Sequence, residues 1–237
     1  MTKLLICDDK TLKSRKGPVV ANIELIKEFI GQGNRFLLTT NQSLYGFLDD
    51  EYDDGWISFI QPSNLLRIFD VQYTEVSCLN GIYLYNERGR LINSYPLSHG
   101  LRERLKGVPP KKNLLVDVTE YVPDYFTMDD DIVGKVRVHV AAENKEKYLR
   151  AKNYVRKVVK EAGEDIDHTV SFNHGNSHSA TYEIWSSKAS EDNQVNFVIN
   201  RHKIKIPDVL DLRGADPKSL NPKIREFGNI VKKKKRW

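Results

Sequence analysis

The chain has 237 residues, 40% of them hydrophobic and 29% charged, a composition typical of a folded protein rather than of a disordered one. No apolar run approaches the roughly 20 residues that a membrane-spanning helix needs, and the short apolar run near the start ends in acids rather than in a secretory pattern. The two cysteines do not suggest a disulfide framework, so we expect no membrane contact and a cytoplasmic or otherwise reducing compartment.

The formal net charge of +5 resides in the last six residues. Residues 232–236 are four lysines and one arginine, whereas the rest of the chain holds 32 basic and 32 acidic residues. This basic tail could contact the phosphates of a nucleic acid or an acidic partner. A solvated, frayed terminus explains the same residues, and the balanced body of the chain gives no sign of a nucleic-acid footprint.

The first 40 residues predict a βαβ unit. Residues 3–7 form an apolar run typical of a buried strand, and a basic, polar loop follows. Apolar residues then recur at helical spacing over 19–30, and glycines at 31 and 33 end the predicted helix. Residues 35–40 predict a second buried strand, and we expect the two strands to be parallel because a helix connects them.

Acidic and aromatic residues fill the segment 41–54, which we expect to be a solvated loop or a helix end. Its carboxylates would need oxygen ligands from other segments to hold a metal ion. Further strands are predicted at 57–60 and 74–78, with a short helix at 65–69 between them.

The character of the chain changes at Asn80. A hairpin with a polar, glycine-containing turn is predicted over 80–92, and residues 143–162 have the strongest amphipathic helical pattern. The block also contains a predicted helix at 101–106 and predicted strands at 113–118, 133–140 and 180–185. Such a mixture is typical of an antiparallel sheet with helices on one face, an α+β pattern.

The last part of the chain returns to the first pattern, with a predicted helix at 190–200 and a strand at 209–212. We therefore predict an α/β fold in which a Rossmann-like parallel sheet is interrupted by an inserted α+β domain. The predicted divisions are a core of 1–79 and 184–231, an inserted domain of 80–183 and a basic tail of 232–237.

Two stretches carry a family resemblance. The run Cys7-Asp8-Asp9-Lys10-Thr11-Leu12 resembles the first motif of the haloacid dehalogenase (HAD) superfamily, an apolar strand followed by Asp-x-Asp-x-Thr-Leu. The block from Cys78 to Tyr85, followed by Gly89, is similar to the entry into the cap domain of the Cof-type (class IIB cap) branch. The resemblance implies a HAD core with an α+β cap, and descent from magnesium-dependent phosphatases of sugars or other small molecules.

In that family, the first motif supplies an aspartate nucleophile, which also binds magnesium, and an aspartate general acid/base two residues later. The matching residues here are Cys7 and Asp9. Sliding the alignment by one residue makes Asp8 the nucleophile but places Lys10 at the acid/base position. Cys7 as a thiolate is a third arrangement, but the neighbouring carboxylates would raise its pKa, and a small buried strand residue is the simpler interpretation.

The second motif ends a strand with a hydroxyl that holds a phosphate oxygen. Thr40 matches it, with Asn41 beside it, and Thr11 is a further phosphate-binding candidate from the first motif. A Thr-Thr-Asn sequence at a strand end also serves simply to cap the next helix.

The third and fourth motifs supply a lysine and the remaining magnesium ligands. The resemblance implies Lys188 for the lysine and Asp216, together with Asp9, for the metal. Ala215 stands where the first acid of the fourth motif should follow Gly214, so we expect weak magnesium binding at most.

Three histidines lie in a stretch rich in Gly, Ser and Asn: His168, His174 and His178. Zinc needs three or four converging ligands, and this stretch offers no thiol or carboxylate at suitable spacing. We expect a polar loop of the cap that reaches toward substrate.

Our leading hypothesis is a HAD-like phosphatase-fold protein that is catalytically weakened or inactive. It would bind a phosphorylated small molecule or a macromolecular partner. One alternative is an active magnesium-dependent phosphohydrolase of a sugar phosphate or nucleotide, with Asp8 or Asp9 as an unconventional nucleophile. A second alternative is a nucleic-acid-associated protein that uses the basic tail.

Overall fold

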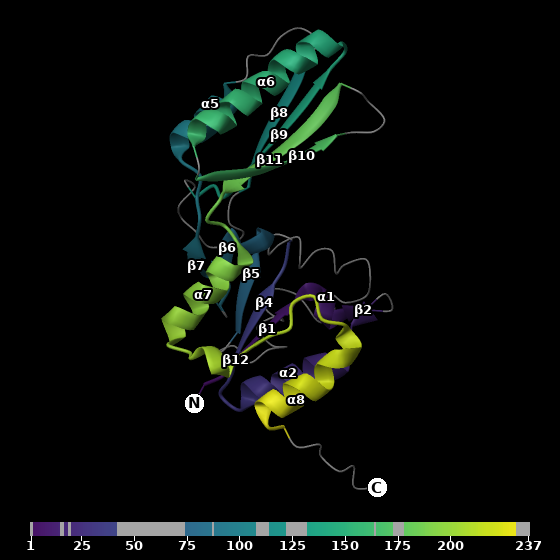
Figure 1. The fold of residues 1–237 in the computed structure, drawn as a ribbon, viewed down its shortest axis with the longest axis vertical. Helices are drawn as coiled ribbons and strands as arrows, with labels where there is room; N and C mark the ends of the chain where they lie inside the picture. Colours follow the sequence, from purple (N-terminus) through teal and green to yellow (C-terminus); the bar gives the residue numbers. More distant parts are fainter. Residues whose placement is uncertain are drawn as a thin grey trace. The chain divides into compact units, whose positions relative to one another are not determined.

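The computed structural model describes most of the chain as two compact units (Figure 1). The first unit comprises residues 1–93, 124–126 and 191–237, and the second comprises 94–123 and 127–190. The residues described are 2–14, 17–18, 20–41, 74–86, 88–107, 114–121, 132–163, 165–172 and 178–230.

A six-stranded sheet forms the centre of the first unit (Figure 1). In spatial order its strands are β12 (Val209–Asp211), β1 (Leu4–Asp8), β4 (Arg35–Thr39), β5 (Thr74–Cys78), β6 (Tyr83–Tyr85) and β7 (Leu91–Ser94). The first four are parallel, and β6 runs antiparallel to β5. The predicted parallel pairing of the first two strands is confirmed, because β1 pairs with β4 over its whole length.

Helices cover both faces of this sheet, which explains why β1 is an unbroken apolar run. Helix α7 (Glu191–His202) packs Val195, Val198 and Ile199 against Leu4 and Ile6 of β1. On the other side, α2 (Val20–Gly31) and α8 (Leu220–Gly228) pack against each other through a stack of Phe29 on Phe227, with ring centroids 5.8 Å apart (Figure 1).

The second unit is a four-stranded antiparallel sheet with two helices on one face (Figure 1). Its strands, in spatial order, are β10 (Ile166–Phe172), β11 (Ser179–Ser186), β9 (Lys135–Ala142) and β8 (Leu114–Tyr121), and its helices are α5 (His99–Lys106) and α6 (Lys145–Ala162). Alternate residues of β9, namely Val136, Val138 and Val140, are fully buried in the core that α5 and α6 complete.

Local signals set the ends of the long helix α6. Its N-cap residue is Asn144, whose side chain accepts a hydrogen bond from the backbone N–H of Lys147 at 3.0 Å. Gly163, with φ of 89°, follows the last turn in a conformation that side chains rarely adopt. The helix predicted over 143–162 therefore forms with nearly the predicted bounds.

Several segments differ from the sequence predictions. Strands β6 and β7, which the sequence analysis placed in the inserted domain, continue the six-stranded sheet of the first unit. Strand β10 occupies a stretch that the sequence predicted as loop. The predicted polar loop after β1 contains α1 (Asp9–Leu12) and the two-residue strands β2 (Lys13–Ser14) and β3 (Gly17–Pro18).

The short helix α8 was not predicted, and three 3₁₀ turns complete the described structure: η1 (Leu79–Gly81), η2 (Ile206–Asp208) and η3 (Pro217–Ser219). The acidic segment, the strand and the helix predicted within 42–73 lie outside the described residues, as does the basic tail. Across the described part of the chain, no helix combines the length and the apolar character needed to cross a membrane. Both cysteines are buried, and neither forms a disulfide bond.

Candidate functional site

Cys7, Asp8, Asp9 and Thr40 lie at the carboxyl ends of neighbouring strands. Strand β1 lies between β12 and β4, and all three are parallel, so the loops that leave them meet at one edge of the sheet (Figure 1). Open parallel sheets place their ligands at this edge.

Cys7 ends the buried part of β1 and is completely inaccessible to solvent. Burial, with smaller contributions from the charges of Asp8 and Asp211, raises the pKa of the Cys7 thiol to about 12, despite an opposing hydrogen bond with Thr11. The sequence predicted a raised pKa but attributed it to the neighbouring acids, whereas desolvation is the larger cause. At neutral pH the thiol is therefore protonated and is not a nucleophile.

Asp8 uses both carboxylate oxygens to hold the backbone. Its Oδ1 accepts a hydrogen bond from the N–H of Thr11 at 2.8 Å, and its Oδ2 accepts one from the N–H of Gly214 at 2.7 Å. The Thr11 hydroxyl in turn donates to the carbonyl oxygen of Asp8 at 2.6 Å. Asp8 thus fastens the start of α1 and the loop after β12 to the end of β1.

Asp9 and Thr40 are bonded directly to each other. The Thr40 hydroxyl donates to Oδ2 of Asp9 at 2.7 Å, and Thr40 is buried while Asp9 is partly exposed. Main-chain bonds fix Thr40 in place, since its N–H donates to the carbonyl of Ser77 and its carbonyl accepts from the N–H of Asn80. Asn41, the next residue, is exposed.

Arg213, in the loop after β12, is the centre of a four-residue ion cluster. The guanidinium of Arg213 donates to both carboxylate oxygens of Asp211, to Asp192 at 2.7 Å and to Glu191 at 3.2 Å. These hydrogen bonds, above all those to Asp211, raise the pKa of Arg213 further. Sequence reasoning missed Arg213, because its partners Glu191 and Asp192 lie about 20 residues earlier, on α7.

Comparison with known proteins shows which fold the chain has. No protein-family model matches the chain, and no curated protein matches it in sequence. Among solved structures, TM0651 from Thermotoga maritima matches 89% of this chain and 79% of its own, with a TM-score of 0.58 and 11% identity. BT1666 from Bacteroides thetaiotaomicron, described among phosphatases of the HAD enzyme superfamily, matches 89% and 76%, with a TM-score of 0.53 and 13% identity. The HAD subclass IIB sugar phosphatase BT4131 matches 89% and 80%, with a TM-score of 0.50 and 11% identity.

The chain has the HAD class IIB fold. The six-stranded sheet and its helices correspond to the HAD core, and the four-stranded sheet with α5 and α6 corresponds to the cap. The resemblance seen in the first motif and at the cap entry is thereby confirmed at the level of fold.

The HAD fold raises the question of magnesium, for which Asp9 and Asp216 were the candidate ligands. Asp216 is exposed, and its Oδ1 accepts from the N–H of Lys218 at 3.0 Å, which caps η3. Asp9 is bonded to Thr40, and Asp8 to two backbone N–H groups. Within the described residues, no three His, Cys, Asp or Glu side chains converge to form a metal site. This donor set does not fit a tightly bound hard cation, which needs several converging oxygens.

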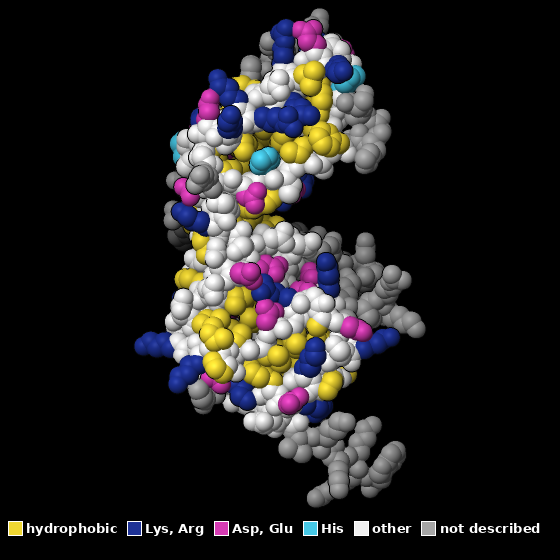
Figure 2. Space-filling model, viewed as in Figure 1, with side chains coloured by type: hydrophobic (Ala, Val, Ile, Leu, Met, Phe, Trp, Pro, Cys, Tyr) yellow, Lys and Arg dark blue, Asp and Glu magenta, His cyan; other side chains and the backbone are white. Residues whose placement is uncertain are grey.

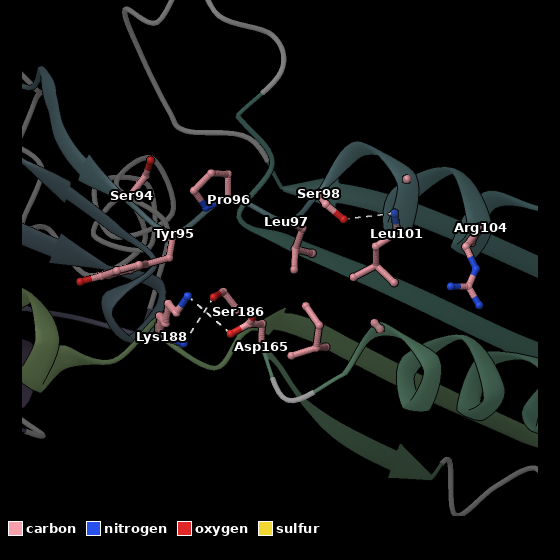
Figure 3. Close-up of a pocket in the computed structure, with 13 residues that line it drawn as sticks. Ser94, Tyr95, Pro96, Leu97, Ser98, Leu101, Arg104, Asp165, Ser186 and Lys188 are labelled. Atoms are coloured by element: carbon pink, nitrogen blue, oxygen red, sulfur yellow. Dashed lines mark hydrogen bonds and ion pairs between the residues drawn. The ribbon is translucent and has the colours of Figure 1, made fainter.

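Lys188, the candidate for the third HAD motif, belongs to the second unit, whereas Cys7, Asp8 and Asp9 belong to the first. Its side chain is exposed and forms an ion pair with Asp165 at 3.4 Å. Both residues line a cavity of about 570 Å³ between the first turn of α5, the end of α6 and the adjoining ends of β10 and β11 (Figure 3). The backbone N–H of Lys188 also donates to the hydroxyl of Ser186 at 3.3 Å.

The three histidines do not form one loop. His168 lies within β10, and His178 lies directly before β11 with its ring 6.3 Å from that of Tyr148. His174 lies outside the described residues. The prediction of a loop was wrong for His168, because β10 pairs with β11 along its whole length.

Proposed function

We propose that this HAD-fold protein is a catalytically weakened or inactive relative of phosphatases that acts by binding. The observation that carries the proposal is the residue at the nucleophile position of the first motif. Cys7 is buried and its pKa is about 12, so it offers a neutral thiol where a HAD phosphatase uses a carboxylate. Ala215 in the fourth motif and the poor magnesium donor set support the same conclusion.

The neighbouring acids do not restore the chemistry. Sliding the motif by one residue assigns the attack to Asp8, but both of its oxygens accept backbone N–H groups. An attack on phosphorus would have to break at least one of these bonds, each strengthened by the carboxylate charge. In the register that matches the family, Asp9 is the acid/base, and it has no carboxylate two residues before it to assist.

Of the two ligand classes, the geometry favours a macromolecular partner over a phosphorylated small molecule. The hydroxyls of Thr11 and Thr40 already donate to Asp8 and Asp9, so a phosphate at this edge would have to displace one of them. It would also face the negative charges of both acids, and the side chains described at this edge do not fit a tightly bound cation that would offset those charges.

Hydrolysis of p-nitrophenyl phosphate with Mg²⁺ tests the proposal. The wild-type chain should release no more nitrophenol than the Cys7→Ala variant, which serves as the control for a neutral residue at this position. Cys7→Asp restores the family carboxylate and should gain turnover that is lost again when Asp9→Asn is added. Wild-type turnover that Asp9→Asn abolishes would establish the active phosphohydrolase instead.

Because Cys7→Asp places a carboxylate in a buried strand, its folding needs a separate check by circular dichroism. If that variant unfolds, the comparison of wild type with Asp9→Asn still decides the question. A thermal-shift titration with inorganic phosphate and Mg²⁺ tests the ligand class, since any ligand that binds the folded chain raises its melting temperature. We expect no shift, and a saturable shift that Thr40→Val removes would favour the phosphorylated small molecule.

A further inference from the structure

Basic residues in the second unit are concentrated on its helices. Helix α6 contains seven Lys and Arg and two Glu, a net charge of +5. Helix α5 adds three basic residues and one acid. The four strands of the unit contain two basic and four acidic residues in total. The balance of positive and negative charges outside the basic tail therefore hides a strongly basic helical layer. In Figure 2, basic side chains lie along the edge of the unit where α6 runs.

The exposed surface of α6 consists of two lengthwise stripes. One stripe contains acids and bases that neutralise each other. Arg150 is paired to Glu146 at 2.5 Å, and Glu161 is paired both to Lys157 at 3.7 Å and to Arg104 of α5. Such i,i+4 pairs stabilise a helix weakly and leave little net charge for a ligand.

The second stripe contains bases and no acid. At 3.6 residues per turn, positions i, i+7, i+11 and i+15 lie within a sector of about 80° along one side of a helix. In α6 these positions are Lys145, Lys152, Arg156 and Lys160, which we call the cationic stripe. The last three follow each other at a rise of about 6 Å, and the whole stripe spans about 22 Å.

An exposed aromatic ring adjoins the cationic stripe. Phe172 ends the edge strand β10 and is 52% exposed, although most phenylalanines are buried. The ammonium of Lys152 lies 5.0 Å from the centre of the Phe172 ring, so the stripe and the ring form one continuous surface. Leu149, which lies on the same side of α6, is also 39% exposed.

We propose that the cationic stripe and Phe172 form a binding surface for single-stranded nucleic acid. Phosphates would follow the line of cations, and a base would stack on the exposed ring, the combination that single-strand-binding proteins use. The positive charge alone would also suit an acidic protein, but binding to acidic side chains would not require the exposed ring of Phe172. A membrane surface fits less well, because an interfacial helix inserts its apolar face and that of α6 is buried in the core of the unit. The proposal does not depend on whether the first unit hydrolyses phosphate esters.

Fluorescence anisotropy with labelled 20-mers of dT and rU tests the proposal on the full chain over 50–200 mM salt. The double variant Lys152→Gln/Arg156→Gln removes one Lys and one Arg from the cationic stripe. Its matched control, Arg150→Gln/Lys157→Gln, removes one Lys and one Arg from the neutralised stripe. We expect the first to weaken binding at least tenfold and to reduce the salt slope by about 1.4, since each phosphate contact on a single strand contributes about 0.7. The control should change affinity less than twofold.

Phe172→Ala separates stacking from charge. It should weaken binding about tenfold with an unchanged salt slope, because a stacked base contributes affinity without releasing counterions. Circular dichroism of each variant excludes unfolding as the cause.

Several outcomes would overturn the proposal. The first is that neither 20-mer binds at 50 mM salt. The second is that the two double variants lose affinity equally. The third is that a duplex binds as tightly as the single strand and that Phe172→Ala leaves the affinity unchanged. Loss of binding on deletion of 232–237 with the stripe variant unchanged would assign the activity to the tail instead. Equal binding to poly-glutamate or to phosphatidylserine vesicles would assign the surface to an acidic protein or a membrane.

Discussion

The two units use their charged side chains in opposite ways. At the strand ends of the first unit, Asp8 holds two backbone N–H groups, Asp9 holds Thr40 and Asp211 holds Arg213. On α6 of the second unit, four cations lie along one side, in a stripe that contains no acid. The carboxylates that phosphatase chemistry would direct at a ligand are thus bonded within the first unit, whereas the cations on this side of α6 have no acid beside them on the same stripe.

The largest expected effect of breaking this contrast comes from Asp8→Ala. It removes two hydrogen bonds to a charged acceptor, each contributing about 1.5 kcal/mol, so the free energy of unfolding should fall by about 3 kcal/mol. Urea denaturation followed by circular dichroism measures the change. The matched control is Asp117→Ala, an exposed carboxylate on β8, which should change the value by less than about 0.5 kcal/mol. Equal stability of the two variants would show that Asp8 is not a structural clamp and is available for chemistry.

A smaller effect, about 1.5 kcal/mol, is expected for Thr40→Val. The variant keeps the shape of the side chain but removes the 2.7 Å hydrogen bond to the Asp9 carboxylate. Thr39→Val is the control one residue earlier, where the buried hydroxyl has no hydrogen-bond partner among the described residues. That variant should be neutral or slightly stabilising, because it removes an unsatisfied polar atom. Urea denaturation of both variants measures the loss in the free energy of unfolding. Equal losses would contradict the structural role of the Asp9–Thr40 hydrogen bond.

The difference between these two threonines shows what the sequence could predict. The buried strand, its parallel pairing and the meeting of Thr40 with the first motif follow from apolar runs and from the βαβ rule. Which partner each side chain chooses does not follow, because it depends on the direction in which the chain leaves β1 and β4. Nothing in the local sequence places Arg213 among two acids of α7.

The second unit was predictable to a different degree. Helix α6 has a regular apolar stripe, and both of its ends carry capping residues that can be recognised in the sequence. Strand β10 lacks such a pattern because it is an edge strand with mostly exposed residues on both sides, so polar side chains such as Asp167 and His168 occupy it. The residues of the cationic stripe can be recognised in the sequence of α6, but a count of charges over the whole chain does not reveal them.

The raised pKa of Cys7 predicts a pH dependence of stability. Above the ordinary thiol pKa of 9.0 the unfolded chain loses a proton that the folded chain retains up to about pH 12, so rising pH favours unfolding. Between pH 8 and 10, the wild type should lose about 1.4 kcal/mol more than Cys7→Ala, in which the group is absent. Wild type and Cys7→Ala share the tyrosines and lysines that titrate in the same pH range, so the contribution of these groups cancels in the difference between the two proteins. If the urea midpoints of wild type and Cys7→Ala fell equally as the pH rises, the thiol would not be desolvated. A thiolate nucleophile would then again be possible.

The smallest expected effect concerns the cationic stripe of the second unit, where we expect removal of charges to change the stability of the fold very little. Lys145 lies in the first turn of α6, near the positive end of the helix dipole, and Lys160 lies in the last turn, near its negative end. Lys145→Gln should therefore stabilise the chain slightly and Lys160→Gln should destabilise it slightly, each by about 0.3–1 kcal/mol, so that the double variant stays within about 0.5 kcal/mol of wild type. Thermal unfolding of the two single variants and the double variant measures the three values. A loss above about 1 kcal/mol in the double variant would mean that the cationic stripe is a structural element like Asp8, and the contrast between the units would no longer hold.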